Sequence, residues 1–466
     1  MSALWTSQEA EAATLGHATR TFEVQGVSID TRTLKSGDLF VALRGEARDG
    51  HEFVSRAIAN GAAAGLVSRM PDDIAREAPL LVVANTQRAL EDLSRAARIR
   101  AHGRVVAVTG SAGKTTTKEM LRLALGALGS THASASSYNN HWGVPLSLAQ
   151  WPRGDAFGVF EIGMNHFGEI RTLASFARPH VALVTTIAPA HLEYFGSVEA
   201  IADAKSEVFE GLAPGGVAVV PADNACSARL IARARQAGVG RILSFGDSDA
   251  ADARLLAWSE GSDGMKIEAE IMGRRCMFRI GALGAHIAHN AIGALLSVAA
   301  LEGDVVDAAA SLASFSALKG RGARFSLPLA GGSAEIIDES YNANPGSMRA
   351  ALALLGSAKP GGGGRRIAVL GDMLELGAES PSLHAALSGA VEHAHVDLVF
   401  ACGRDMRALF DALPSSRRGV WGATSSAIAP QIIRMLRPGD VALIKGSLGS
   451  RMSTILDALK NGAGAN

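Results

Sequence analysis

The 466-residue sequence contains little cysteine, few aromatic residues and no net charge. Its three cysteines, Cys226, Cys276 and Cys402, are far apart and form no CxxC pair, which argues against a disulfide framework or a zinc knuckle. Lysine plus arginine and aspartate plus glutamate each number 45, so no excess charge favours nucleic acid or an anionic membrane. Aromatic residues make up 5% of the chain, and none gather with basic residues as in single-strand binders. We therefore expect no nucleic-acid partner.

A targeting signal and a long hydrophobic run are also missing. The first residues, MSALWTSQEAEAATLG, lack the basic start and the continuous apolar core of a signal peptide. The most apolar stretch, 291–301, is too short to cross a bilayer. These features predict a cytoplasmic protein without stable membrane insertion, and we expect it to be a monomer.

Glycine (52 residues) and alanine are abundant, and 48% of the chain is hydrophobic, which suits an α/β enzyme with several cores. The length is too great for one typical domain. Alternating apolar strands and amphipathic helices predict an α/β fold class with three domains. We expect an N-terminal α/β domain at 1–103, a central P-loop domain with a doubly wound parallel sheet at 104–317, and a Rossmann-like C-terminal domain at 318–466.

Apolar runs bounded by turn residues give the expected strands. Segment 250–280 alternates differently and predicts an antiparallel excursion. Asn344 before Pro345 predicts the start of a helix over 345–355, and Ser380 before Pro381 predicts another in the same way. A helix is also expected over 197–211. Residues 37–43 are expected to form a turn that leads into a strand. The other expected strands are 80–83, 105–108, 157–162, 181–187, 217–220, 334–337, 367–370, 398–401 and 441–444.

Residues 104–118, RVVAVTGSAGKTTTK, carry the strongest functional signal. After an apolar strand, Gly110 and Gly113 allow a tight turn whose N–H groups can point at an anion. Lys114 adds charge for the β- and γ-phosphates, and Thr115 adds a hydroxyl for Mg²⁺. The helix that follows directs its positive N-terminus at the phosphates. The segment predicts a nucleoside triphosphate site; the alternative is a glycine-rich turn with an incidental lysine.

Three further residues lie where ligands of open α/β sheets bind, beyond the carboxyl ends of the strands. Glu161 ends the strand 157–162 and could reach phosphate-bound Mg²⁺, or it could be an ordinary acidic residue. His191 follows the strand 181–187 and could contact a metal or phosphate, although an isolated histidine is more often simply hydrogen-bonded. Lys205 lies beside an apolar helix face, where burial would lower its pKa and a neutral amine could form a carbamate with CO₂. Alternatively, Lys205 extends its amine to water.

In the last third of the chain, polar residues crowd between an expected strand and helix. The sequence DESYNANP at 338–345 places acids and amides there, and helix capping accounts for Asn344 alone. Arg324, near a glycine-rich junction at 320–322, is a candidate for stabilising a transferring phosphoryl group, or else a solvated surface residue. The junction is a candidate hinge.

These motifs together resemble the Mur ligases, the ATP-dependent amide-forming enzymes of peptidoglycan precursor synthesis. The resemblance covers all three blocks, and GDMLELG with DESYNANP points to the branch that adds D-Ala-D-Ala. SIDTR at 28–32 and GDLFVALRGEARDGHEF at 37–53 resemble the UDP-binding domain of that branch. The other matching motifs are TGSAGKTTTK at 109–118, SSYNNHWGVPLSL at 136–148, EIGMNHFGEI at 161–170, APAHLEYFGS at 188–197, AKSEVF at 204–209, GAHIAHNAIGAL at 284–295, IIDESYNANPGSMRAAL at 336–352 and GDMLELG at 371–377.

The resemblance implies ATP, two Mg²⁺ ions and a carbamylated lysine, with UDP-MurNAc-tripeptide and D-Ala-D-Ala as substrates. It also implies a ligase reaction through an acyl phosphate, with Lys114, Lys205, His191 and Arg324 as catalytic residues. The implied ligand contacts are Gly110, Ser111, Ala112, Gly113, Lys114, Thr115 and Thr116 for the phosphates; Asn290 for adenine; Arg324 and Asp338 for the nucleotide; Thr115, Glu161, His191 and Lys205 for the metals, with Lys205 as the carbamate; Asn139 and Asn140 for the muramoyl group; Ser28, Asp49, Gly50, His51 and Phe53 for uridine; and Asn342 and Asn344 for the dipeptide.

Some alternatives remain open at the level of the sequence. Arg321 could replace Arg324 as the nucleotide-contacting arginine. The chain departs from the family pattern at Glu339, where a second aspartate often stands. Other functions to weigh are a diaminopimelate- or lysine-adding Mur ligase, a folylpolyglutamate-type synthetase, a P-loop NTPase that forms no bond, and an inactive binding protein.

Overall fold

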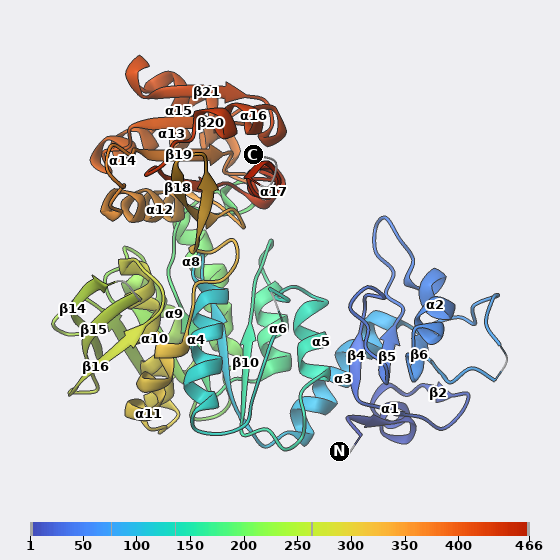
Figure 1. Cartoon of the computed structure of the whole chain (residues 1–466). Coiled ribbons are helices and arrows are strands. Elements are labelled where there is room, and N and C mark those ends of the chain that lie inside the picture. The colour runs from blue at the N-terminus through green and yellow to red at the C-terminus, as the bar shows by residue number, and fades with distance from the viewer. Residues whose placement is uncertain (1–2, 76, 136, 262–263, 464–466) are drawn as a thin grey trace.

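A computed structural model describes residues 3–75, 77–135, 137–261 and 264–463, and these residues form three α/β units, each with its own sheet (Figure 1). The N-terminal unit, in blue, lies beside the central unit, and the C-terminal unit, in orange and red, lies above it. None of the helices in the described residues combines the length and apolar character that a bilayer span requires.

The N-terminal unit has a five-stranded sheet in the described residues, in the order β2-β7-β6-β5-β4. All neighbours are parallel except β2 and β7. The unit packs on the central one through Trp5, whose indole Nε1 donates a 2.8 Å hydrogen bond to the carbonyl of Ala149. Its elements are β1 (Trp5–Thr6), α1 (Ser7–Thr14), β2 (His17–Ala18), β3 (Glu23–Val24), β4 (Gly26–Ser28), β5 (Asp38–Val41), α2 (Val54–Ala59), β6 (Ala64–Val67), β7 (Leu80–Val82) and α3 (Thr86–Arg100).

The central unit has a nine-stranded sheet in the order β16-β15-β14-β13-β12-β11-β8-β10-β9, as far as the described residues show. From β9 to β14 neighbouring strands are parallel, and β14, β15 and β16 are antiparallel. The predicted antiparallel excursion over 250–280 is therefore confirmed. The strands are β8 (Arg104–Thr109), β9 (Thr131–Ala133), β10 (Phe157–Glu161), β11 (Val181–Val184), β12 (Val217–Pro221), β13 (Arg241–Gly246), β14 (Ala253–Gly261), β15 (Gly264–Ile271) and β16 (Arg274–Ile280).

Helices cover both faces of this sheet, as its doubly wound pattern requires. Along β8, Val106 and Val108 join the core beneath α4, α10 and α11, whereas Val105 and Ala107 join the core beneath α5, α6, α8 and α9. Because both faces are buried, residues 105–108 of β8 form a continuous apolar run instead of alternating. Each fully buried valine contributes about 1.5–3 kcal/mol. The helices are α4 (Lys114–Gly126), α5 (Gly143–Ala149), α6 (Glu169–Ala177), α7 (Leu192–Phe195), α8 (Val198–Ser206), α9 (Ser227–Gln236), α10 (Ala285–Ala300) and α11 (Val305–Ser311).

The C-terminal unit has a six-stranded sheet among the described residues, in the order β17-β18-β22-β19-β20-β21. Only the hairpin of β17 and β18 is antiparallel in it. Asn344 caps α12 as predicted, since its side chain accepts a hydrogen bond from Ser347 N. The elements are β17 (Ala323–Leu329), β18 (Gly332–Glu339), α12 (Pro345–Ser357), β19 (Arg366–Gly371), α13 (Ser380–Ala385), α14 (Leu387–His393), β20 (Leu398–Cys402), α15 (Arg407–Ala412), β21 (Arg418–Gly422), α16 (Ser425–Met435), β22 (Val441–Lys445) and α17 (Ser453–Ala463).

Several predicted element boundaries were wrong, and three of them have a clear physical reason. Strand β11 ends at Val184 and not at 187, because the next residues turn to the phosphate loop: Ser111 N donates to Thr186 O at 2.8 Å. The helix expected to 211 is α-helical only to Ser206 and continues as a 3-10 helix, Glu207–Gly211. The Glu207 carboxylate there accepts from Gly168 N at the start of α6. Ser380 lies inside α13 and is not its cap, since a 3-10 turn precedes it.

Candidate active site

A cavity of about 850 Å³ lies between the central and C-terminal units. On the central side it is lined by the phosphate loop and by residues that follow β10, β11, β12 and β13. The opposite wall comes from residues after β18, β19 and β22. The carboxyl edges of two sheets thus face one another, which is where open α/β sheets bind ligands.

The phosphate loop connects β8 to α4 through two glycines with positive φ, Gly110 at +147° and Gly113 at +80°. Space as well as backbone conformation requires glycine here. A Cβ on Gly110 would lie 1.9 Å from Thr185 Oγ1, and one on Gly113 would lie 2.9 Å from the Asn290 amide. Gly113 caps α4 without a side-chain hydrogen bond, so the first N–H groups of the helix remain available to an anion.

Lys114 begins α4 and turns its amine back over the loop, donating a 2.8 Å hydrogen bond to Gly110 O. Burial lowers the pKa of Lys114 below its ordinary value, Glu161 opposes that shift, and Arg321 adds to it. The loop residues Ser111, Ala112, Gly113, Lys114, Thr115 and Thr116 line the cavity. Gly110 is not among the lining residues, and its carbonyl accepts the hydrogen bond from Lys114.

Thr115 and Glu161 meet at the base of the cavity, where Thr115 Oγ1 donates a 2.8 Å hydrogen bond to Glu161 Oε2. The other carboxylate oxygen, Oε1, accepts from Asn139 Nδ2 at 2.6 Å. Only 1% of Glu161 is exposed. A hydroxyl and a carboxylate at this separation, next to a phosphate loop, form an oxygen donor set of the kind that suits Mg²⁺.

Lys205 lies on α8 at the wall of the cavity and is 1% exposed. Burial and the nearby charge of Lys114 lower the pKa of Lys205 well below its ordinary value. No described residue lies within hydrogen-bond or ion-pair distance of its amine. The Lys205 side chain is therefore buried at the cavity wall and does not extend over the outer surface of the protein.

His191 precedes α7 and has a left-handed backbone, with φ of +59°. Its Nδ1 lies 2.5 Å from Glu375 Oε2 in the C-terminal unit. This contact holds the pKa of Glu375 below its ordinary value. The structure therefore brings Thr115, Glu161, His191 and Lys205 to one cavity, as the metal prediction required.

The two candidate arginines have different surroundings. Arg324 lies on β17 in a 2.9 Å ion pair with Glu335 and is not among the residues that line the cavity, so its contact with the nucleotide stays a prediction. Arg321 does line it: the guanidinium lies 4.1 Å from the ring centre of Tyr341 and donates to Ser137 Oγ at 3.2 Å. Arg324 belongs to the hairpin of β17 and β18 and pairs with Glu335, whereas Arg321 precedes that hairpin and lines the cavity.

Asp338 is buried and does not line the cavity. Its carboxylate accepts from Gly320 N at 2.9 Å and from Ser340 Oγ at 2.6 Å. Asp338 therefore fixes the turn that carries Arg321, and its direct contact with the nucleotide stays a prediction.

The amide residues expected around the cavity all line it: Asn139, Asn140, Asn290, Asn342 and Asn344. Asn140 Oδ1 accepts from Gly143 N at 2.9 Å and so begins α5. Asn342 O accepts from Lys445 Nζ at 3.0 Å. Asn344 reaches across the two units, because its Nδ2 donates to Ser111 O at 3.3 Å.

The residues expected to bind uridine lie in the N-terminal unit, away from this cavity: Ser28, Asp49, Gly50, His51 and Phe53. Asp49 Oδ1 lies 2.6 Å from His51 Nδ1, and His51 Nε2 accepts from Ser68 N at 2.9 Å. Their mutual contacts organise the turn around Gly50, which leaves the uridine site a prediction.

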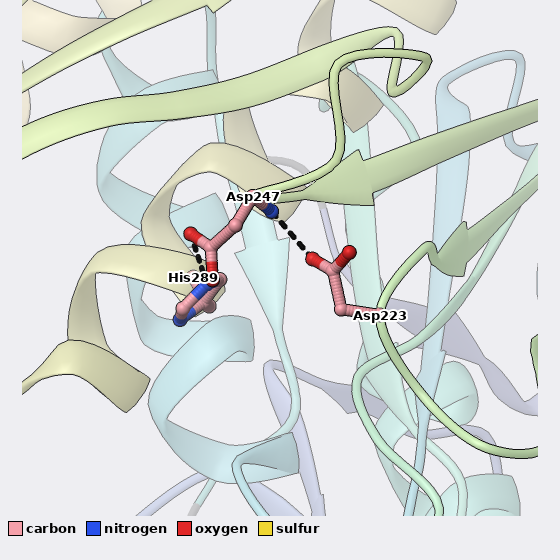
Figure 2. A group of neighbouring side chains, drawn as sticks. All are labelled: Asp223, Asp247 and His289. Carbon is pink, nitrogen blue, oxygen red and sulfur yellow. Dashed lines mark hydrogen bonds and ion pairs between the residues drawn. The ribbon is translucent and has the colours of Figure 1, made fainter.

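Several cavity residues were missed in the sequence. Asp223, Asp247 and His289 converge after β12, after β13 and on α10, with ligand atoms within 4.8 Å of one another (Figure 2). His289 Nε2 lies 3.0 Å from Asp247 Oδ1, and Asp247 N donates to Asp223. Lys445 pairs with Glu339 at 3.1 Å. Asp223, Asp247 and Lys445 end or follow strands, so the rule that found Glu161 could have found them.

The fold and the cavity define an α/β protein of the nucleotide-binding class, in which a separate C-terminal domain faces the phosphate loop across the cavity. Three family models match the chain: "Mur ligase family, catalytic domain" at residues 23–104, "Mur ligase middle domain" at 108–298 and "Mur ligase, glutamate ligase domain" at 323–448. The chain belongs to the Mur ligase family, an ATP-dependent ligase class, and the resemblance seen in the sequence is confirmed.

Relatives that are similar over nearly the whole chain support this family assignment. The UDP-N-acetylmuramoyl-tripeptide--D-alanyl-D-alanine ligase of Escherichia coli (strain K12) is 36% identical over 94% of both chains. The crystal structure of MurF from Acinetobacter baumannii has a TM-score of 0.85 and 32% identity, covering 98% of this chain and 99% of its own. The MurF ligase from Thermotoga maritima in complex with ADP has a TM-score of 0.78 and 27% identity, covering 94% and 98%.

Proposed function

We propose that this chain joins the amine of D-Ala-D-Ala to the terminal carboxylate of UDP-MurNAc-tripeptide, at the expense of ATP. The observation that carries the proposal is the cavity in which the phosphate loop faces polar residues of a second domain. The E. coli and A. baumannii proteins, similar over nearly the whole chain, bear names for this reaction. The product is the pentapeptide precursor used in peptidoglycan synthesis.

The reaction activates a poor electrophile. A carboxylate oxygen of the tripeptide attacks the γ-phosphorus of ATP, ADP leaves, and an acyl phosphate remains. The dipeptide amine attacks the acyl carbon, loses a proton, and expels phosphate as the amide forms. Lys114 and Arg321, which both line the cavity, would neutralise charge on the transferring oxygens. Closure by the C-terminal domain excludes water, which would otherwise hydrolyse the acyl phosphate.

Two Mg²⁺ ions fit the donor atoms of the cavity. Thr115 and Glu161 would hold the first, and His191 with a carbamylated Lys205 would hold the second. The buried amine of Lys205, with its lowered pKa and with no partner among the described residues, fits the carbamate because only a neutral amine combines with CO₂. When bound, the ions would neutralise phosphate charge and orient the oxygens.

The remaining assignments follow the domains. We propose that residues 1–103, with Ser28, Asp49, Gly50, His51 and Phe53, bind the uridine end, and that residues 104–317 bind ATP, with Asn290 near adenine. Residues 318–466 would supply the dipeptide contacts. The dipeptide contacts would come from Asn342 and Asn344. Asn139 and Asn140 of the central domain would contact the muramoyl group. We also propose that the chain acts as a monomer in the cytoplasm.

Phosphate release tests this function when each substrate is omitted in turn. With ATP and Mg²⁺, release should require both UDP-MurNAc-tripeptide and D-Ala-D-Ala and should yield a new amide. Release with neither substrate would identify an NTPase, and release only with diaminopimelate or lysine as the amine would identify another Mur-type ligase.

A further inference from the structure

One loop of the C-terminal unit docks directly on the central unit beside the predicted metal ligands. Glu193 N, at the start of α7, donates a 3.1 Å hydrogen bond to Glu375 O. Glu375 Oε2 lies 2.5 Å from His191 Nδ1. Gly377 follows so closely that a Cβ there would lie 3.4 Å from Glu193 Cα. The loop therefore contacts the turn around His191 through backbone and side chain together.

Both partners of this ion pair have an unfavourable backbone conformation. His191 has φ of +59° and Glu375 has φ of +63°, in the left-handed region that residues with a Cβ rarely adopt. The conformation of His191 is held by α7, since Tyr194 N and Phe195 N both donate to His191 O. Such strain persists where surrounding contacts impose it, and it is concentrated at functional sites. Here it directs the two side chains at one another.

The contact also distinguishes the two imidazole nitrogens by their positions. Nδ1 faces the Glu375 carboxylate in the ion pair, so Nε2 is the nitrogen that remains for a ligand. No described residue lies within hydrogen-bond distance of Nε2, and His191 lines the cavity. A carboxylate on the outer nitrogen is the partner that metal-binding histidines commonly have.

We infer that Glu375 is a positioning residue which orients the imidazole of His191 for a divalent cation, so that this cation site is complete only when the C-terminal domain is docked. The inference rests on the proposed role of His191 as a metal ligand. It adds that the ligand is oriented by a different domain. Metal binding and domain closure would then stabilise one another.

The test measures cation binding and domain closure, not turnover. Mn²⁺ would be titrated into the protein saturated with a non-hydrolysable ATP analogue, with free Mn²⁺ read by electron paramagnetic resonance. Small-angle X-ray scattering on the same samples gives the radius of gyration. The variants are Glu375→Ala, Glu375→Gln, His191→Ala and the double variant. Glu379→Ala is the matched control, because it removes an exposed carboxylate from the same loop region.

Glu375→Ala should weaken the affinity for one Mn²⁺ about 10- to 100-fold, the usual effect of losing such a partner. It should also raise the radius of gyration, while Glu379→Ala changes neither. Glu375→Gln keeps an acceptor for Nδ1 and should fall between. In the His191→Ala background, Glu375→Ala should cause no further loss of Mn²⁺ affinity.

Three results would overturn the inference. If His191→Ala weakens Mn²⁺ binding but Glu375→Ala does not, the inference fails while the proposed metal role of His191 stands. If the two losses add in the double variant, Glu375 does not act through His191. If His191→Ala leaves Mn²⁺ binding unchanged, the metal role in the proposed function and the inference fail together.

Discussion

Asn344 of the C-terminal domain donates a hydrogen bond to the carbonyl of Ser111 in the phosphate loop, with 3.3 Å between Nδ2 and O. The same side chain caps α12 by accepting from Ser347 N at 2.8 Å. One asparagine therefore ties the start of a helix in one domain to the phosphate site of another. The position of the C-terminal domain is therefore linked directly to that of the phosphate loop.

Asn344→Ala should reduce turnover more than the loss of a helix cap explains. The cap itself is worth about 1 kcal/mol. Thr424→Ala is the matched control, since Thr424 caps α16 in the same domain without reaching another. Both variants should lower the unfolding midpoint by a similar amount, and only Asn344→Ala should raise KM for ATP. Equal kinetics for the two would refute the cross-domain role.

Lys114→Ala should abolish measurable turnover and leave the fold intact. The amine is the cation placed over the loop, and its hydrogen bond to Gly110 O is local. Circular dichroism and thermal unfolding check the fold, and phosphate release checks the activity. Near-normal activity in this variant would rule out the assignment of the ATP site.

Lys205→Ala should be almost inactive and should recover some activity when short carboxylic acids are added. The truncated side chain leaves a space where an added carboxylate can replace the carbamate. Lys205→Arg retains a charge but cannot form a carbamate, and it should be inactive with no recovery. Wild-type activity in Lys205→Ala would show that no carbamate is needed.

Arg321→Ala should lower kcat about 100-fold or more, the usual cost of losing a group that stabilises transition-state charge. Arg324→Ala should change kcat less than about twofold, since it removes only a partly exposed ion pair with Glu335. Steady-state kinetics on both variants decide between them. A larger loss of kcat in Arg324→Ala than in Arg321→Ala would identify Arg324 as the nucleotide-contacting arginine.

Gly113→Ala should weaken ATP binding and destabilise the central domain. A φ of +80° costs a residue with a Cβ about 1–2 kcal/mol. The added methyl would also meet the Asn290 amide at 2.9 Å. Gly126→Ala, in the last turn of the same helix, meets nothing within 4 Å and should be neutral or slightly stabilising. Calorimetric titration with ADP and thermal unfolding measure the two effects.

Local sequence patterns predicted most of the fold, because strand and helix signals depend on nearby residues. The apolar run of β8, the Asn344 cap and the antiparallel segment all belong to this kind. The end of β11 could not be predicted from nearby residues, because it depends on hydrogen bonds to the phosphate loop, which is far away in the sequence. The pairing of His191 with Glu375 also joins two domains, and no spacing within the sequence encodes it.

The choice between Arg321 and Arg324 shows the same limit at closer range. Both residues stand in one glycine-rich junction, and their sequence context is similar. The difference arises from the pairing of β17 with β18, which sets Arg324 against Glu335, while the turn held by Asp338 directs Arg321 into the cavity. Strand pairing between two segments decides the outcome.

The most direct test of the proposed function follows one oxygen atom. UDP-MurNAc-tripeptide labelled with ¹⁸O in its terminal carboxylate would be incubated with ATP, Mg²⁺ and D-Ala-D-Ala, and the released phosphate analysed by mass spectrometry. If the carboxylate is activated as an acyl phosphate, each phosphate released carries one ¹⁸O atom from the tripeptide. Unlabelled phosphate would contradict the mechanism, because ATP would then be hydrolysed by water without activating the carboxylate.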